Sequence, residues 1–238
     1  MDAAAAGPDA PVPTCPRWTT ADLVRHQGSV HRWAVAHAEG LTGNRPELVA
    51  KEAARDAPAG FGARLRWLVD GAATLVDALA AAPRDLRALR FLSDAPPARA
   101  FWARRQAHET TIHRVDAAAA RQGRPLKPDD FDLDPALAAD GLDELLTGFL
   151  PRNSSRLRRP APARLLVAPT DRPQRWTVRI SMDAPATVRT DTPEPDVLLS
   201  GSAAGLYLGL WNRGDGFTVT GDETVTQLWR AQVRVRWS

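Results

Sequence analysis

The sequence predicts an α+β protein in which an N-terminal up-and-down four-helix bundle precedes a small α+β sandwich domain. Up to residue 150, apolar residues recur at helical spacing in long segments with modest connections, as in a bundle. Residues 151–162 are rich in Pro, Arg and Ser and predict a linker. From residue 163 the apolar pattern alternates with period two. The expected domains are therefore 1–150 and 163–238.

The ends of the predicted helices carry recognisable signals. Thr19 and Asp22 form a start that resembles a capping box, after a tip that we expect to be disordered. Pro83 ends one helix and Gly123 caps another, while Asp134 precedes a proline in a first turn. The long helices are expected at 19–40, 62–82, 97–122 and 135–150, with a short helix around 47–55.

The C-terminal region predicts short strands mixed with two helices. A turn at residues 200–202 is expected to cap the first of these helices. Strands are expected at 164–168, 175–180, 186–190, at the start of 196–211 and at 217–222, and helices at the end of 196–211 and over 223–229.

Composition narrows the class of protein. No apolar run among the 238 residues approaches the roughly 20 that a membrane span needs, and the first residues lack a secretory pattern. We therefore expect a cytoplasmic protein without a membrane partner. The lone Cys15 excludes an internal disulfide and a multi-cysteine zinc site. The net charge is +3, but the arginines are scattered and no basic face carries interleaved aromatics, so no nucleic-acid partner is expected.

A candidate metal site lies in the third long helix. Glu109 and His113 are four residues apart, which places a carboxylate and an imidazole on one helix face, one turn apart. His26, in the first helix, is the obvious third ligand for a divalent cation. The alternative is an exposed ion pair between Glu109 and His113, worth a few tenths of a kcal/mol, or about 0.2–0.5.

The other histidines do not fit this set. His37 shares the face of His26 but lies eleven residues on, about 16 Å along the helix axis. His108 points roughly 140° away from His113. We expect His31, His37 and His108 to be surface residues, and Cys15 to be a small buried residue beside Trp18.

Several motifs resemble those of the mycothiol-dependent maleylpyruvate isomerase family. They are Cys-Pro-Arg-Trp-Thr at 15–19, Asp-Leu-Val-Arg-His at 22–26, the segment 108–116, and Leu-Trp-Asn-Arg at 210–213. The resemblance covers nearly the whole chain, although Arg17 stands where the family usually has glycine. It implies a DinB-like metal-binding bundle followed by a domain related to sterol-carrier folds.

The resemblance also implies cofactors and site residues. His26, Glu109 and His113 would bind Zn²⁺, and the metal would hold the thiol of mycothiol, the low-molecular-weight thiol of actinobacteria. Arg213 either pairs with an acidic neighbour or contacts an anionic substrate or mycothiol, and the resemblance favours the second role, catalytic and cofactor-binding. We expect a monomer or homodimer that acts on a small molecule.

Three classes of function remain open on the sequence. A thiolate stabilised by zinc can add to an electrophile, which leads to isomerisation or to S-transfer. A hydrolase or lyase would instead use a zinc-bound water and a general base, for which Asp116 is the candidate. A metallated bundle can also bind or sequester ligands without catalysis.

Overall fold

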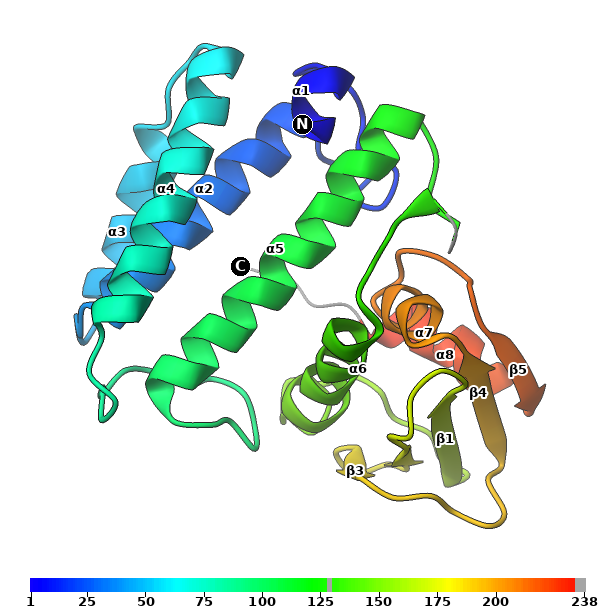
Figure 1. Ribbon diagram of the computed structural model, residues 1–238. Coiled ribbons are helices and arrows are strands. Elements are labelled where there is room, and N and C mark those ends of the chain that lie inside the picture. The colour runs from blue at the N-terminus through cyan, green and yellow to red at the C-terminus, as the bar shows by residue number, and fades with distance from the viewer. Residues whose placement is uncertain (128–129, 234–238) are drawn as a thin grey trace. The chain divides into compact units, whose positions relative to one another are not determined.

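The computed structural model describes residues 1–127 and 130–233, which form two compact units (Figure 1). The helical unit comprises residues 1–91 and 95–125, and the α+β unit comprises 92–94 and the described residues from 126 onward. The helical unit contains α1 (Asp2–Ala6), α2 (Thr20–Ala38), α3 (Arg45–Arg55), α4 (Phe61–Ala81) and α5 (Ala98–Gln122).

Helix α2 packs against α3, α4 and α5. Its start is fixed by a true capping box, because the Thr19 side chain accepts from the Asp22 backbone and Asp22 accepts from the Thr19 backbone. Helices α2 and α4 approach closely at Gly28 of α2, where an added Cβ would lie 1.9 Å from the Trp67 ring of α4. Arg32 locks this contact by donating to the Gly28 and Trp67 carbonyls while its guanidinium covers the Trp67 ring.

Helix α5 ends at Gly123, whose φ of 69° is the left-handed cap that the sequence predicts. Its C-terminal half is rich in buried alanine, and α1 packs against it. The expectation of a disordered tip is wrong, because the alanine-rich segment 2–6 is helical. Alanine is the best helix former, and Ala3 and Ala6 pack on a cluster that includes Val12 and Leu23.

The α+β unit is built on a five-stranded sheet with strand order β3-β2-β1-β4-β5. β1 and β4 are parallel, and the other neighbouring pairs are antiparallel. Helix α7 begins at the predicted turn, where Ser202 accepts from the Gly205 backbone. The elements are α6 (Pro135–Asp143), the π-helix η2 (Glu144–Phe149), β1 (Ala163–Pro169), β2 (Trp176–Ile180), β3 (Ala186–Val188), β4 (Val197–Gly201), α7 (Ala203–Leu210), β5 (Thr218–Gly221) and α8 (Thr224–Gln232).

The helix predicted at 135–150 does not join the bundle. It forms α6 and η2, packs against α7 in the α+β unit, and accepts a hydrogen bond from Thr187 at the Leu146 carbonyl. Helical periodicity shows that this helix has an apolar face, but it does not show whether helices or a sheet cover that face. The expectation that it joins the bundle was therefore wrong. The predicted boundary at residue 150 therefore lies inside the α+β unit, and α3 joins α4 and α5 in packing against α2.

The predicted linker 151–162 also lies inside the α+β unit. Leu157 is fully buried, and the Arg159 backbone donates to the Ser181 carbonyl. The Arg159 side chain pairs with Asp222. The buried Leu157 and the hydrogen bond and ion pair of Arg159 therefore attach residues 151–162 to the α+β unit, although their composition is typical of a linker.

The predicted α+β class is confirmed, since a helical region precedes a small mixed sheet with helices. In the residues that the structure describes, no helix is both long and apolar enough to cross a membrane.

Candidate metal centre

The structure brings His26 of α2 together with Glu109 and His113 of α5. One ligand atom from each residue lies within 4.8 Å of the other two. Glu109 Oε1 is 3.4 Å from His26 Nε2 and 3.2 Å from His113 Nε2, so a single carboxylate oxygen faces both imidazoles. The two imidazole rings meet edge to face, with centroids 5.0 Å apart.

Glu109 is held as a buried anion. Its residue surface is only 3% exposed, which excludes the exposed ion pair considered above. Its second oxygen, Oε2, accepts from the Arg105 guanidinium at 3.0 Å. Burial raises the pKa of Glu109, but hydrogen bonds from His113 and His26 and the Arg105 charge outweigh burial and bring that pKa well below its usual value.

His113 is held between two carboxylates. Its Nδ1 lies 2.9 Å from Oδ2 of Asp116, on the side of the ring opposite Glu109. Burial lowers the pKa of His113, but the hydrogen bonds to Asp116 and Glu109 raise it to about 9. Without a cation, His113 is therefore protonated, and its Nε2 proton points at Glu109.

The segment before α2 contacts this centre. Thr14 Oγ1 donates to Asp116 Oδ1 at 2.5 Å, and Cys15 Sγ lies 3.7 Å from Asp116 Oδ2. The Trp18 ring lies 4.8 Å from the His26 ring and 5.9 Å from the His113 ring, measured between centroids. Cys15 lies beside Trp18, as predicted, but it is only partly buried and not the buried residue that the sequence predicted. The contact of this segment with Asp116 was not predicted, because no spacing rule links residue 14 to residue 116.

The donor set fits a divalent cation such as Zn²⁺. Two imidazole nitrogens and a carboxylate oxygen are a common three-ligand set for catalytic zinc, which leaves a position for a further ligand. A bound cation would compete with the proton on His113 Nε2 for the position beside Glu109. Asp116 then supplies the carboxylate partner that metal-binding histidines usually have at their other nitrogen.

The three remaining histidines are not surface residues, contrary to expectation. His31, His37 and His108 are 2%, 3% and 0% exposed. His31 Nε2 lies 2.9 Å from Nε2 of Gln27, and His37 stacks on Trp102. The neighbours of His31 and His37 are polar or aromatic side chains of the helical unit. The apolar spacing within one helix does not show which residues of other helices cover it.

Arg213 belongs to the α+β unit. It follows α7, directly after Asn212 in the left-handed region with φ 59°, and its guanidinium donates to the Trp211 carbonyl at 2.9 Å. Its proposed contact with substrate or thiol stays a prediction.

The fold and the centre together define a two-unit α+β protein with a His₂Glu cluster in its helical unit. The model of the mycothiol maleylpyruvate isomerase N-terminal domain matches residues 1–118, and the model of the MDMPI C-terminal domain matches residues 136–228. The chain therefore belongs to the mycothiol maleylpyruvate isomerase family, a family of enzymes.

Solved structures agree in fold. The crystal structure of the mycothiol-dependent maleylpyruvate isomerase is 14% identical, with a TM-score of 0.56, and the match covers 92% of this chain and 85% of that chain. A mutant form of that isomerase is 16% identical, with a TM-score of 0.57, over 92% of this chain and 87% of that chain. The search of curated proteins found no match.

Proposed function

We propose that this protein is a zinc-dependent enzyme that activates mycothiol as a thiolate, either to isomerise a small electrophilic and anionic substrate or to attach mycothiol to it through the thiol sulfur. Family membership supports the use of mycothiol. The observation that carries the metal requirement is the convergence of His26, Glu109 and His113 within 4.8 Å. When bound there, zinc would stabilise the thiolate form of the thiol at neutral pH.

The residues of the chain prepare this centre before any ligand arrives. Arg105 occupies one oxygen of Glu109 and thereby directs the other oxygen toward the histidines. Asp116 fixes the ring of His113 through Nδ1, so that Nε2 is directed at the metal position. The Trp18 ring packs beside the rings of both histidines.

Substrate recognition is assigned to Arg213. A guanidinium presents paired N–H donors that match a carboxylate, and the substrate is expected to be anionic. The Leu-Trp-Asn-Arg motif at residues 210–213 supports this role through the family resemblance.

The hydrolytic alternative receives less support. It needs a general base with a free carboxylate oxygen, and Asp116 is fully buried with both oxygens engaged, by Thr14 and by His113.

Two measurements test the proposal. The first is the zinc content of the purified protein, and the second is the turnover of maleylpyruvate with and without mycothiol. Purified protein should carry about one equivalent of zinc, and His113→Ala should lose most of it while keeping its helicity. His31→Gln is the matched control, since it changes a buried α2 histidine outside the cluster. Full zinc content in His113→Ala would refute the ligand set. Turnover at full rate without any thiol would refute the use of mycothiol.

A further inference from the structure

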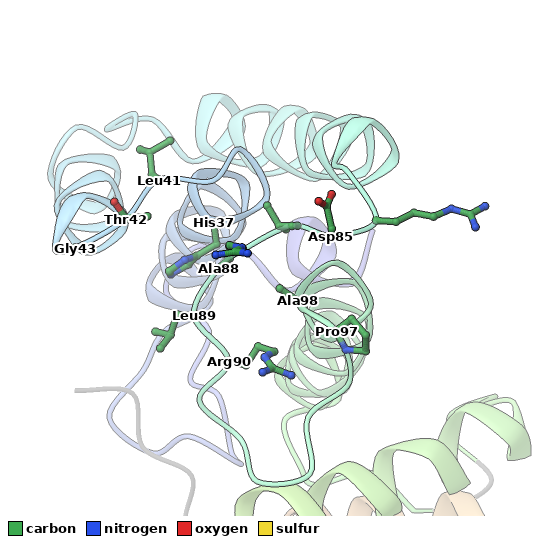
Figure 2. A pocket seen from close by; sticks show the side chains of 13 residues that line it. His37, Leu41, Thr42, Gly43, Asp85, Ala88, Leu89, Arg90, Pro97 and Ala98 are labelled. Atoms are coloured by element: carbon green, nitrogen blue, oxygen red, sulfur yellow. The ribbon is translucent and has the colours of Figure 1, made fainter.

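A cavity lies in the helical unit, at the end of α2 that is farther from the metal centre. Its volume is about 690 Å³, which is in the range of small-molecule sites. It is open to solvent on one side and is lined by the C-terminal end of α2 and the segment that follows, by residues 84–90, and by the start of α5 (Figure 2). His37 lies eleven residues after His26 on α2, about 16 Å along the helix, so this cavity is separate from the metal centre.

His37 is a buried polar group without a polar partner at this cavity. It is 3% exposed, and neither ring nitrogen has a hydrogen-bond partner among residues 1–127 and 130–233. Its ring is fixed by stacking on Trp102, with centroids 4.4 Å apart, and by an edge contact with Trp33. Such a group costs stability unless a ligand supplies the missing hydrogen bond.

The charged side chains that line the cavity are mainly cationic. They are Arg84, Arg87 and Arg90, against the single carboxylate of Asp85. Arg90 donates to the Ala95 and Pro96 carbonyls and so braces the segment before α5, whereas Arg84 and Arg87 form no ion pair within the described part of the chain. Unpaired guanidinium groups around a cavity favour an anion, and their paired donors match a carboxylate.

The remaining lining is largely apolar. Leu41, Ala88, Leu89, Pro97 and Ala98 contribute to it, and Figure 2 labels all five. A compact inorganic anion would leave these side chains in contact with water, whereas a molecule with a hydrophobic body would cover them.

We propose that this cavity is a binding site for a small organic carboxylate with an apolar body. The carboxylate pairs with Arg87, with Arg84 adding to the positive charge, and accepts a hydrogen bond from His37, whose ring nitrogens are covered until the lining shifts to admit the ligand. The apolar body contacts Leu41, Leu89 and Pro97. Burial lowers the pKa of His37, so the neutral ring offers one donor nitrogen to this ligand.

Titration of the zinc-loaded protein with benzoate tests the proposal, by calorimetry and by intrinsic tryptophan fluorescence. The fluorescence should change because His37 stacks on Trp102. Benzamide, which has the same shape without the charge, and inorganic phosphate, which lacks the apolar body, should each bind at least roughly tenfold more weakly.

Two variants and one control localise the binding. Arg87→Ala and His37→Phe should each weaken benzoate by about tenfold or more, and phenylalanine preserves the stack on Trp102. Arg66→Ala removes the same charge from an exposed position of α4 outside the cavity and should bind benzoate like the wild type. If His37→Phe does not fold, the double variant Arg84→Ala/Arg87→Ala, at two exposed positions, replaces it.

The zinc dependence of the binding separates this cavity from the metal centre. Removal of zinc with EDTA should leave benzoate affinity unchanged. Absence of benzoate binding, its loss with EDTA, equal binding of benzamide or phosphate, or unaltered affinity in the arginine variants would each overturn the proposal.

Discussion

The role that the sequence predicts for Asp116 differs from the role that its neighbours in the structure support. On the sequence it lies about one turn beyond His113 and is a candidate general base. In the structure it is fully buried, and its two oxygens accept from Thr14 and contact His113 Nδ1. Its position relative to His113 was predictable from helical spacing, whereas its contact with Thr14 depends on the fold of the segment before α2.

Asp116→Asn should therefore weaken zinc binding without removing catalysis. Loss of a carboxylate behind a metal-binding histidine typically lowers metal affinity about 10- to 100-fold. At saturating zinc, turnover should fall by less than about tenfold, since a general base would contribute roughly 10²–10⁴-fold. Chelator competition measures the affinity and steady-state kinetics the turnover. Asp143→Asn, which removes a carboxylate that pairs with Arg189 in the α+β unit, is the control and should retain zinc affinity. Wild-type affinity in Asp116→Asn would contradict the assigned role.

His31 should make the stability of the protein depend on pH. Burial is the main cause that lowers the pKa of His31 from 6.5 to about 4. Between these values the unfolded chain binds a proton that the folded chain does not, so stability decreases as pH falls from 6.5 toward 4. The loss between pH 7 and pH 5 should be on the order of 2 kcal/mol from this residue.

Urea unfolding of EDTA-treated protein at several pH values measures this loss. His31→Gln should remove most of the excess pH dependence, because glutamine keeps a polar contact for Gln27 but does not titrate. An identical pH dependence in wild type and His31→Gln would show that His31 is not the cause.

At the scale of elements, the contact of α2 with α4 depends on one glycine. Gly28→Ala should destabilise the helical unit, since a Cβ at this position would lie 1.9 Å from the Trp67 ring. Overpacking of this kind typically costs about 1–3 kcal/mol. Gly62→Ala on α4 is the control, because the nearest atom to its added Cβ is the end of the Arg66 side chain at 4.0 Å, and it should be neutral or stabilising by up to about 1 kcal/mol. Denaturant unfolding of both variants measures the difference, and equal stabilities would contradict the packing argument.

The sequence predicted helix and strand positions better than their partners. The ends of α2 and α5 follow from local signals, the capping box at Thr19 and Asp22 and the left-handed Gly123. The partner of the helix at 135–150 was mispredicted, because burial of its apolar residues is compatible with both a bundle and a sheet. Local chemistry fixes where an element begins and ends, while tertiary contacts decide what covers it.

At the scale of the whole molecule, the predicted sites fall in different units. All three proposed ligands and Asp116 belong to the helical unit, and Arg213 belongs to the α+β unit. The cluster of His26, Glu109 and His113 was predictable because Glu109 and His113 share a helix and His26 was the histidine at a compatible position. The cavity at His37 was not, because it is formed by a segment between helices that carries no periodic pattern.

This division predicts that metal binding and substrate binding can be separated by mutation. Arg213→Ala should keep the zinc content of the wild type, since no proposed ligand lies in its unit. Its kcat/KM for an anionic substrate with mycothiol should fall by roughly 30-fold or more, because loss of a charge-assisted contact costs about 2–5 kcal/mol when the partner charge is left buried. Elemental analysis and steady-state kinetics measure the two quantities. Arg164→Ala, which removes a half-exposed arginine of β1 paired with Asp196, is the matched control and should retain both. A fall in zinc content parallel to the fall in activity would indicate that Arg213 acts on the stability of the metal centre, and unchanged kinetics would remove Arg213 from the substrate site.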